Sequence, residues 1–208
     1  MTDITSHRRV KLIDNRAVPK SIITAGVYQG FFPHQLEEVE ASWADARERA
    51  VTEGRTMGFA PLEHSHWDWR RKADSMEAGH HVLVAVEVDT EVQGLMAVLQ
   101  RPRPARLGDG YVIYVDFLES APWNLKSFVE LPRYLGVGTV LMSEAVRMSV
   151  QAGTEGRVGL HFLPQAEGFY EKCKLTRVGE DPTYYDLVYF EYHGRDAMDW
   201  LVSIGDSP

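Results

Sequence analysis

The chain has 208 residues, 44% of them hydrophobic and 25% charged, which is typical of a globular protein with a sizeable core. Its formal net charge of −8 argues against a nucleic-acid partner and suits a cationic substrate such as an amine, although the same charge also serves solubility. One cysteine excludes an internal disulfide, there is no apolar run of membrane-spanning length, and residues 1–9 lack the apolar core that a signal peptide has. We expect one cytoplasmic domain, residues 1–208, with no nucleic-acid or membrane partner. The oligomeric state stays open, and a homodimer is compatible with the sequence.

The first third of the chain predicts one strand and one long helix. Residues 1–19 are polar and mixed in charge, and we expect a partly ordered lead-in segment. Ser21–Tyr28 is β-rich and predicts the first strand. After Pro33, apolar residues recur at spacings of three and four, which predicts a helix that stops near Gly54.

The segment Pro61–Lys72 combines histidines, tryptophans and basic residues, and it predicts a second helix that ends near Glu77. Three interpretations stay open. In the first the tryptophans pack in the core, in the second they contact an acceptor substrate, and in the third they stack on nucleobases. The acidic net charge disfavours the third.

The middle of the chain is rich in strand signals. Residues 81–88 and 91–99 are two predicted strands on either side of a short Asp89-Thr90 turn, which predicts a hairpin. Residues 111–118 form the strongest strand of the sequence. Residues 119–132 then make a long connection, and a connection of that length inside a compact domain is more often functional than not.

A glycine-rich segment follows this connection and opens a helix. Arg133–Thr139 reads Arg-Tyr-Leu-Gly-Val-Gly-Thr, and the apolar helical run behind it should end near residue 152. Glycines let the backbone approach a ligand, and a helix start offers unpaired N–H groups to an anion. The dinucleotide fingerprint would need glycine or alanine at Leu141, and no Gly-Lys-Ser/Thr is present for a P-loop.

The last third predicts a strand, a helix and two further strands. The strand covers 157–162, and the helix runs from Pro164, a favoured first-turn residue, to Cys173. Residues 175–178 and 183–190 are the final strands, and residues 193–208 should form a frayed polar tail. We interpret Cys173 as a small apolar residue of its helix.

Two motifs carry a family resemblance. Arg133, Gly136 and Gly138 match Arg-x-x-Gly-x-Gly, and Ala166-x-x-Phe169-Tyr170-Glu171-Lys172 follows on the expected helix. Together they resemble the acyl-CoA loop and the fourth helix of the GCN5-related N-acetyltransferases, over roughly residues 20–192. The sequence departs from the family at Leu163, where asparagine is common, and at Lys174, where glycine is usual.

The resemblance implies an α/β (α+β) single-domain fold. Its central sheet would be mixed and mostly antiparallel, with about six to seven strands splayed in the middle and about four flanking helices. It implies acetyl transfer from acetyl-CoA to a primary amine of a small molecule or protein by direct attack, without a metal. The alternative is a catalytically silent acyl-CoA-binding module. The implied cofactor-binding residues are Leu118, Ser120, Arg133, Tyr134, Leu135, Gly136, Val137, Gly138, Thr139 and Phe169.

The resemblance also suggests proton-transfer groups. Tyr170 is the expected general acid, because a phenol can give its proton to the departing thiolate. The base stays open between Asp116, Glu119 and a water relay, since strand alternation puts Asp116 on the face of Leu118 while Glu119 lies nearer the end of the strand. His161 ranks below both acids.

For the acceptor, we expect His66 and Trp69 to face Trp123 and Asn124 across an apolar pocket that favours a cationic amine. The alternative is that the tryptophans are core residues that never touch substrate.

Overall fold

The computed structural model describes residues 8–30, 33–53, 68–76 and 80–206. In these residues the chain forms ten strands and five α-helices and divides into two compact units. The first unit holds residues 1–96 and 118–141, and the second holds residues 97–117 and 142–208. The division falls within three elements, which are β4 (Glu91–Leu99), β6 (Tyr111–Ser120) and α3 (Val137–Gln151).

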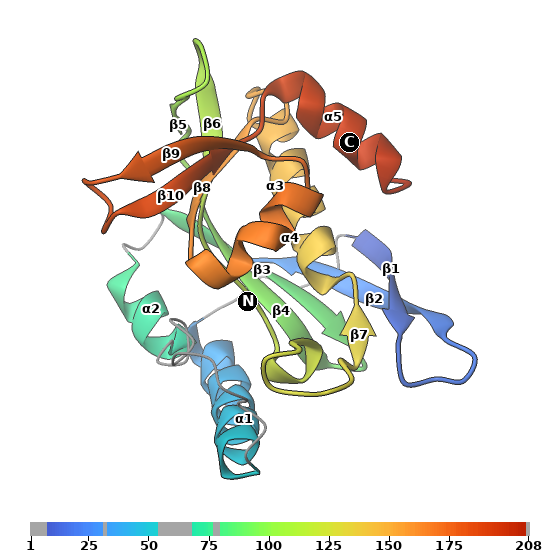
Figure 1. Cartoon of the computed structure of the whole chain (residues 1–208). Helices are drawn as coiled ribbons and strands as arrows, with labels where there is room; N and C mark the ends of the chain where they lie inside the picture. The colour runs from blue at the N-terminus through green and yellow to red at the C-terminus, as the bar shows by residue number, and fades with distance from the viewer. Residues whose placement is uncertain (1–7, 31–32, 54–67, 77–79, 207–208) are drawn as a thin grey trace. The chain divides into compact units, whose positions relative to one another are not determined.

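The first unit is a mostly antiparallel sheet with two helices. Its strands lie in the order β7-β1-β2-β3-β4, and β1 pairs with β2 along its whole length. The helices α1 and α2 lie side by side in Figure 1 and contact each other. The elements are β1 (Arg8–Asp14), β2 (Ser21–Gln29), α1 (Pro33–Thr52), α2 (Trp69–Ser75), β3 (His81–Val88), β4 (Glu91–Leu99), the 3₁₀ turn η1 (Pro122–Asn124) and β7 (Tyr134–Leu135).

The second unit is a mixed sheet with the order β6-β8-β10-β9, in which β6 and β8 run parallel and the remaining pairs are antiparallel. The short strand β5 pairs with β6. The elements are β5 (Arg103–Pro104), β6 (Tyr111–Ser120), α3 (Val137–Gln151), β8 (Val158–Phe162), the 3₁₀ turn η2 (Pro164–Ala166), α4 (Glu167–Lys172), β9 (Thr176–Asp181), β10 (Leu187–Glu191) and α5 (Gly194–Ser203).

The apolar periodicities build the core as predicted. In α1, the side chains of Leu36, Val39 and Trp43 are buried, and their spacing puts them on one face of the helix. The β3–β4 hairpin turns at Asp89 and Thr90, which both have positive φ, as a two-residue hairpin turn requires. No helix in the described residues is long and apolar enough to cross a membrane.

Both ends of the chain are more ordered than the sequence analysis expected. The lead-in contains β1, whose Leu12 is buried, and the tail contains α5, whose Trp200 and Leu201 are buried. The expectation of a frayed end was therefore wrong for residues 194–203, while the ordered part of the lead-in includes residues 8–14. In both segments a few apolar side chains spaced along a polar background suffice to attach the element.

The last predicted strand, 183–190, was also too long. Residues 182–186 form a turn, and β10 begins only at Leu187. The Asp181 carboxylate accepts hydrogen bonds from the backbone N–H and the hydroxyl of Thr183, at 2.9 and 2.6 Å. An aspartate that binds its own backbone two residues on, followed by a proline, starts a turn rather than a strand.

Candidate functional site

The glycine segment forms a helix start in the first unit. Gly136 is exposed, with a φ of 97°, and its carbonyl accepts the first α3 hydrogen bond, from the N–H of Val140 at 2.9 Å. The N–H groups of Val137, Gly138 and Thr139 belong to the first turn and have no intrahelical acceptor. Such a turn attracts an anion.

Gly94 of β4 lets the sheet approach this helix start. A Cβ atom at Gly94 would lie 2.6 Å from the Val137 side chain and 3.3 Å from the backbone oxygen of Glu119. Any larger residue would therefore push β4 away from α3. The approach fixes the first turn of α3 against the end of β6.

The segment before Gly136 is held by the N-terminal strand. β7 pairs with β1, with Tyr134 opposite Asp14 and Leu135 opposite Ile13. The N–H of Asn15 donates to the carbonyl of Arg133 at 3.0 Å. The Arg133 guanidinium pairs with the Glu91 carboxylate, so its charge is already engaged at β4.

Trp123 and Asn124 converge on one buried side chain, Gln93 of β4. The Trp123 indole N–H donates to Gln93 Oε1 at 2.8 Å, and Asn124 Nδ2 donates to the same oxygen at 3.1 Å. Asn124 Oδ1 accepts from the N–H of Tyr134 at 2.9 Å. These bonds shape the connection between β6 and α3.

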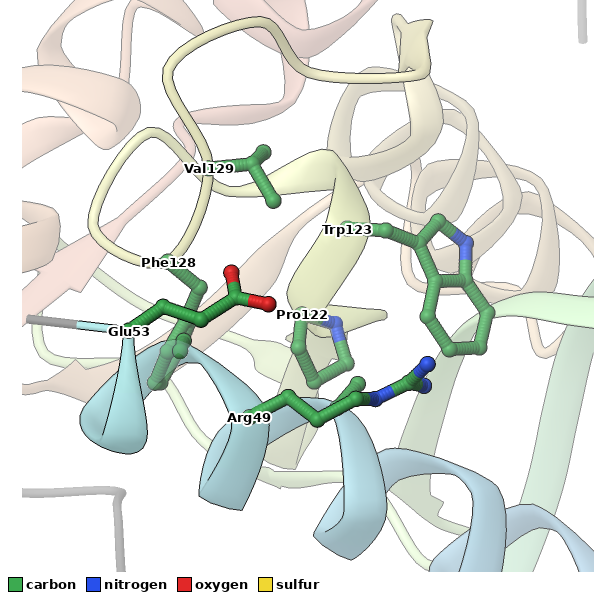
Figure 2. A pocket seen from close by; sticks show the side chains of 8 residues that line it. Arg49, Glu53, Pro122, Trp123, Phe128 and Val129 are labelled. Atoms are coloured by element: carbon green, nitrogen blue, oxygen red, sulfur yellow. The ribbon is translucent and has the colours of Figure 1, made fainter. Parts of the chain in front are cut away.

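Trp123 also walls a pocket of about 240 Å³ in the first unit. One wall comes from α1 and the residue just after it, and the other comes from the connection after β6. Figure 2 shows the Arg49 guanidinium extending towards the Trp123 indole and the Glu53 carboxylate pointing towards Pro122. The lining residues are Ala46, Arg49, Ala50, Glu53, Pro122, Trp123, Phe128 and Val129.

Glu119 lies in a buried polar cluster of the first unit and is 4% exposed. Its Oε2 accepts the Trp69 indole N–H at 2.7 Å, and its Oε1 accepts from Arg47 at 3.1 Å. Arg47 also pairs with Glu40 at 2.8 Å, and Glu40 accepts the backbone N–H of Trp69 at 2.9 Å. The four side chains tie α1, α2 and the end of β6 together.

Burial raises the pKa of Glu119 to about 7, even though Arg47 and Trp69 act in the opposite direction. Desolvation penalises the carboxylate form, and one guanidinium shared between two carboxylates does not compensate fully. Glu119 is therefore partly protonated near neutral pH.

In the second unit, the pairing between β6 and β8 opens partway along both strands. The paired residues are Ile113 with Val158, Tyr114 with Gly159 and Val115 with Leu160. Beyond Val115, β6 continues without a β8 partner, while His161 and Phe162 of β8 pair only with β10. This is the splay that the sequence analysis predicted, and Asp116 is the first β6 residue inside it.

A polar network lines one face of this opening. The Tyr184 hydroxyl donates to Asp116 Oδ1 at 3.0 Å, and the Tyr114 hydroxyl lies 2.7 Å from His161 Nδ1. His161 Nε2 lies 2.9 Å from Asp181 Oδ2, and the Tyr184 ring stacks on the imidazole with centroids 4.2 Å apart. All five side chains come from β6, β8, the end of β9 and the turn after it.

Tyr170 lies on the other face of the same sheet. Its ring packs on Phe162 and Phe190, at centroid distances of 5.8 and 6.5 Å, and on its neighbour Phe169 at 5.0 Å. His161 and Phe162 are neighbours along β8, and Tyr189 and Phe190 are neighbours along β10. Because successive side chains of a strand point to opposite faces, the two phenylalanines lie on the face opposite to His161 and Tyr189. Burial raises the pKa of Tyr170 above its usual range, so the phenol keeps its proton.

Solved structures share this architecture at low sequence identity. FeeM, an N-acyl amino acid synthase from uncultured soil microbes, aligns with a TM-score of 0.52 and 10% identity over 95% of this chain and 98% of that chain. An acetyltransferase of the GNAT family from Listeria monocytogenes aligns at 0.51 and 12%, over 82% and 95%. The chain has the fold of the GCN5-related N-acetyltransferases, the GNAT fold.

A third similar structure is that of an uncharacterized protein from Bacillus halodurans, with a TM-score of 0.55 and 11% identity over 96% of this chain and 99% of that chain. No protein-family model and no curated protein matches the sequence. The predicted fold class is therefore confirmed, with more strands and one more helix than expected.

The predicted site residues are divided between the two compact units. Leu118, Ser120, the segment 133–139, Trp123, Asn124, Glu119 and Trp69 belong to the first unit. Asp116, Phe169 and Tyr170 belong to the second. Trp69 is fully buried against Glu119 rather than in the wall of the pocket. His66 lies outside the described residues.

Sequence reasoning missed the partners that the fold places around the candidate residues. Nothing in the sequence analysis singled out Arg47 or Glu40, and Tyr184 lay within a predicted strand. Asp181 carried one usable signal, because Asp-Pro-Thr is a turn sequence. Within the described residues, no group of three or more His, Cys, Asp or Glu side chains is arranged to hold a metal ion.

Proposed function

We propose that the protein is an N-acetyltransferase that moves the acetyl group of acetyl-CoA to a primary amine by direct attack. The observation that carries this proposal is the β6–β8 opening of the second unit, with Asp116 on one face and the protonated Tyr170 phenol on the other. Direct acyl transfer needs one group that takes a proton from the amine and one that gives a proton to the thiolate. The GNAT fold supports the same reaction class.

Asp116 is the better candidate for the base. It is half-buried at the start of the opening, whereas Glu119 is 4% exposed and has both carboxylate oxygens engaged, one by Arg47 and one by Trp69. A base must reach the proton it removes. We assign Glu119 to holding α1, α2 and β6 together.

Tyr170 serves as the general acid. Its buried phenol stays protonated at neutral pH, so a proton is present for the CoA thiolate when the C–S bond breaks. The aromatic packing by Phe162 and Phe169 holds the ring in one orientation.

The first turn of α3 holds the CoA pyrophosphate. Val137, Gly138 and Thr139 supply N–H groups, and the positive φ of Gly136 turns the chain into the helix. Leu118 and Ser120 at the end of β6 would bind the pantetheine arm through their backbone groups. The guanidinium of Arg133, paired with Glu91, orders the segment before the helix.

The pocket beside Trp123 is the proposed acceptor site. Its aromatic and aliphatic lining suits an apolar body, and Arg49 and Glu53 give the lining one charge of each sign. Asn124 contributes by fixing the orientation of Trp123 through Gln93.

The test is to offer the purified protein acetyl-CoA and a wide panel of small amines and peptides while following thiol release. We expect release that depends on a subset of amines and is lost in Gly138→Asp. Acetyl-CoA binding without any amine-dependent thiol release would instead support the silent acyl-CoA-binding module. The absence of binding would contradict both.

A further inference from the structure

Tyr184 connects the two strands that separate in the second unit. The last residues that pair between β6 and β8 are Val115 and Leu160, so in the same register Asp116 would stand opposite His161. The strands are open at this point, and Tyr184 reaches both of them instead. Its ring stacks on the His161 imidazole, with centroids 4.2 Å apart and 17° between the ring planes, and its hydroxyl donates to Asp116 Oδ1 at 3.0 Å.

The imidazole on which Tyr184 stacks is held at both of its nitrogens. The Tyr114 hydroxyl lies 2.7 Å from His161 Nδ1, and Asp181 Oδ2 lies 2.9 Å from His161 Nε2. Asp181 Oδ1 accepts two hydrogen bonds from Thr183, so the carboxylate that orients the imidazole is itself fixed. The side chain of His161 is only 3% exposed. The Tyr184 ring therefore rests on a buried support whose orientation is fixed by hydrogen bonds.

The turn that carries Tyr184 has an unusual backbone. Tyr185 and Asp186 have φ values of 56° and 57°, in the left-handed region that residues other than glycine rarely adopt. The N–H groups of Tyr184 and Asp186 both donate to the Asp181 carbonyl, at 2.9 and 3.1 Å. Tyr185 is 90% exposed, whereas Tyr184 packs on His161. The hydrogen bonds define one conformation of the turn, and that conformation puts the Tyr184 ring over the sheet.

We propose that Tyr184 is a positioning residue: it bridges the β6–β8 opening and holds the Asp116 carboxylate in the orientation from which it removes the amine proton. This inference rests on the proposed function, because it takes Asp116 as the base. The Asp116 side chain has no β8 partner beside it, and a hydrogen bond to Oδ1 restricts its rotamers and fixes the plane of the carboxylate. Tyr184 acts through Asp116.

Tyr184 keeps its own proton throughout the reaction. The amine nitrogen bonds to the thioester carbon, the C–S bond breaks, the Asp116 carboxylate takes the surplus amine proton, and Tyr170 gives its proton to the sulfur. The hydrogen bond from Tyr184 has two effects on the base. It stabilises the ionised carboxylate, which makes Asp116 less basic, and it orients the carboxylate, which speeds proton removal. Removal of the hydroxyl should reverse both effects.

Two other tyrosines provide matched controls. Tyr185→Phe removes a hydroxyl from the same turn, but from a side chain that is 90% exposed. Tyr189 lies in the buried layer, with its ring 4.9 Å from the His161 ring, and its hydroxyl donates to Glu191 at 3.0 Å. Neither substitution removes the donor to Asp116, so each tests for the loss of a hydroxyl alone.

The first measurement does not depend on activity. Crystal structures of the wild type and of Tyr184→Phe show directly whether the hydroxyl fixes the base. In the variant, we expect the new ring to stay stacked on His161 and the Asp116 side chain to occupy more than one rotamer. An Asp116 carboxylate that keeps the single wild-type orientation in the variant would overturn the proposal.

The second measurement is kinetic. Tyr184→Phe should lower kcat about ten-fold, with the KM for acetyl-CoA within about two-fold of wild type. The low-pH limb of kcat/KM should move to higher pH, because a carboxylate that loses a donor holds its proton more tightly. Tyr185→Phe and Tyr189→Phe should keep both the rate and the limb. A lower melting temperature with an unmoved limb would make Tyr184 a structural residue only.

The groups around the base determine how this limb is interpreted. Tyr184 and Tyr114 both interact electrostatically with Asp116, and burial raises the pKa of each phenol, so both stay neutral across the limb. The Arg103 guanidinium, 4.1 Å over the Tyr114 ring, stays cationic. Burial lowers the pKa of His161, which keeps the imidazole neutral at neutral pH.

A double variant tests whether Tyr184 acts through Asp116. The effects of independent substitutions multiply, whereas a positioning residue has nothing to position once its partner is removed. Tyr184→Phe should therefore cause no further loss in the residual rate of Asp116→Ala. A second ten-fold loss in that background would overturn the positioning role.

The outcomes separate this inference from the proposed function. Thiol release by the wild type, with Tyr184→Phe indistinguishable from Tyr185→Phe and Tyr189→Phe, would overturn the positioning role and leave the acetyltransferase standing. No thiol release from the wild type with any amine would overturn the proposed function and the role of Tyr184 in it, whatever rotamers Asp116 adopts.

Discussion

The indole N–H of Trp69 donates a hydrogen bond of 2.7 Å to Glu119 Oε2 in the interior of the first unit. Trp69 is the first residue of α2, and its backbone N–H is taken by Glu40 of α1 at 2.9 Å. One residue thus attaches α2 both to the end of β6 and to α1. A helix of seven residues has little stability of its own, so α2 depends on these two bonds and on the burial of the indole.

Trp69→Phe should lower the free energy of unfolding by about 1–3 kcal/mol, because the buried Glu119 oxygen loses its donor while the aromatic volume is nearly kept. Denaturant unfolding midpoints measure this change. Trp123→Phe is the control, since its indole donates to a neutral amide at a half-buried position and should cost less. Equal costs for the two variants would contradict a special role for the Trp69–Glu119 bond.

The raised pKa of Glu119 should make the free energy of unfolding fall as pH rises. Its pKa is about 7 in the folded chain and near 4.5 in the unfolded chain, so the folded state binds more protons between these values. The stability of the wild type relative to Glu119→Gln should therefore decrease from pH 5 to pH 7 and level off above pH 8, by about 3 kcal/mol in total. Unfolding curves across this range test the sign, and a difference that rises with pH would refute the assignment.

Gly138→Asp should abolish the rise in melting temperature that acetyl-CoA causes. A ligand that binds only the folded state stabilises it, by about 2.7 kcal/mol at one hundred times its Kd. An aspartate in the first turn of α3 suits the helix dipole, so the variant should fold, but its charge would repel the pyrophosphate. Thermal unfolding with and without ligand measures the shift. Gly138→Ala, which adds no charge, should keep most of it.

Tyr170→Phe should lower kcat about one-hundred-fold or more while the affinity for acetyl-CoA stays near wild type, because the change removes a proton donor and almost no volume. Thiol release gives kcat, and the thermal shift gives affinity. Tyr192→Phe is a suitable comparison, since it removes another buried tyrosine hydroxyl, one that donates to the Cys173 carbonyl. Wild-type turnover in Tyr170→Phe would remove Tyr170 from the mechanism.

Trp123→Ala should raise the KM for the amine several-fold without weakening acetyl-CoA binding, because the side chain walls the proposed acceptor pocket. Leu131→Ala is the matched control: it lies in the same connection but is exposed and outside the pocket lining. Steady-state kinetics with the best amine of the panel separates the two. A loss of stability with an unchanged KM would make Trp123 a core residue only.

The order of the elements from β2 to β10, apart from the short strands β5 and β7, and the glycine helix start could be derived from the sequence, because they depend on local rules. Apolar spacings of three and four define the buried face of α1, alternation defines the β3–β4 hairpin, and only glycine fits the positive φ at residue 136 comfortably. The motif residues around Gly136 and Tyr170 identified the fold for the same reason, since each motif lies within one short segment.

Only the tertiary structure decided what each candidate side chain touches. Glu119 and Asp116 differ little as sequence positions, yet one is closed off by Arg47 and Trp69 while the other lies in the opening of β6 and β8. Their partners are 50 to 72 positions away along the chain, and no periodicity encodes such a contact. The pKa of a carboxyl follows from burial and from neighbouring charges in space, so the fold, and not the local sequence, makes the surroundings of these two acids different.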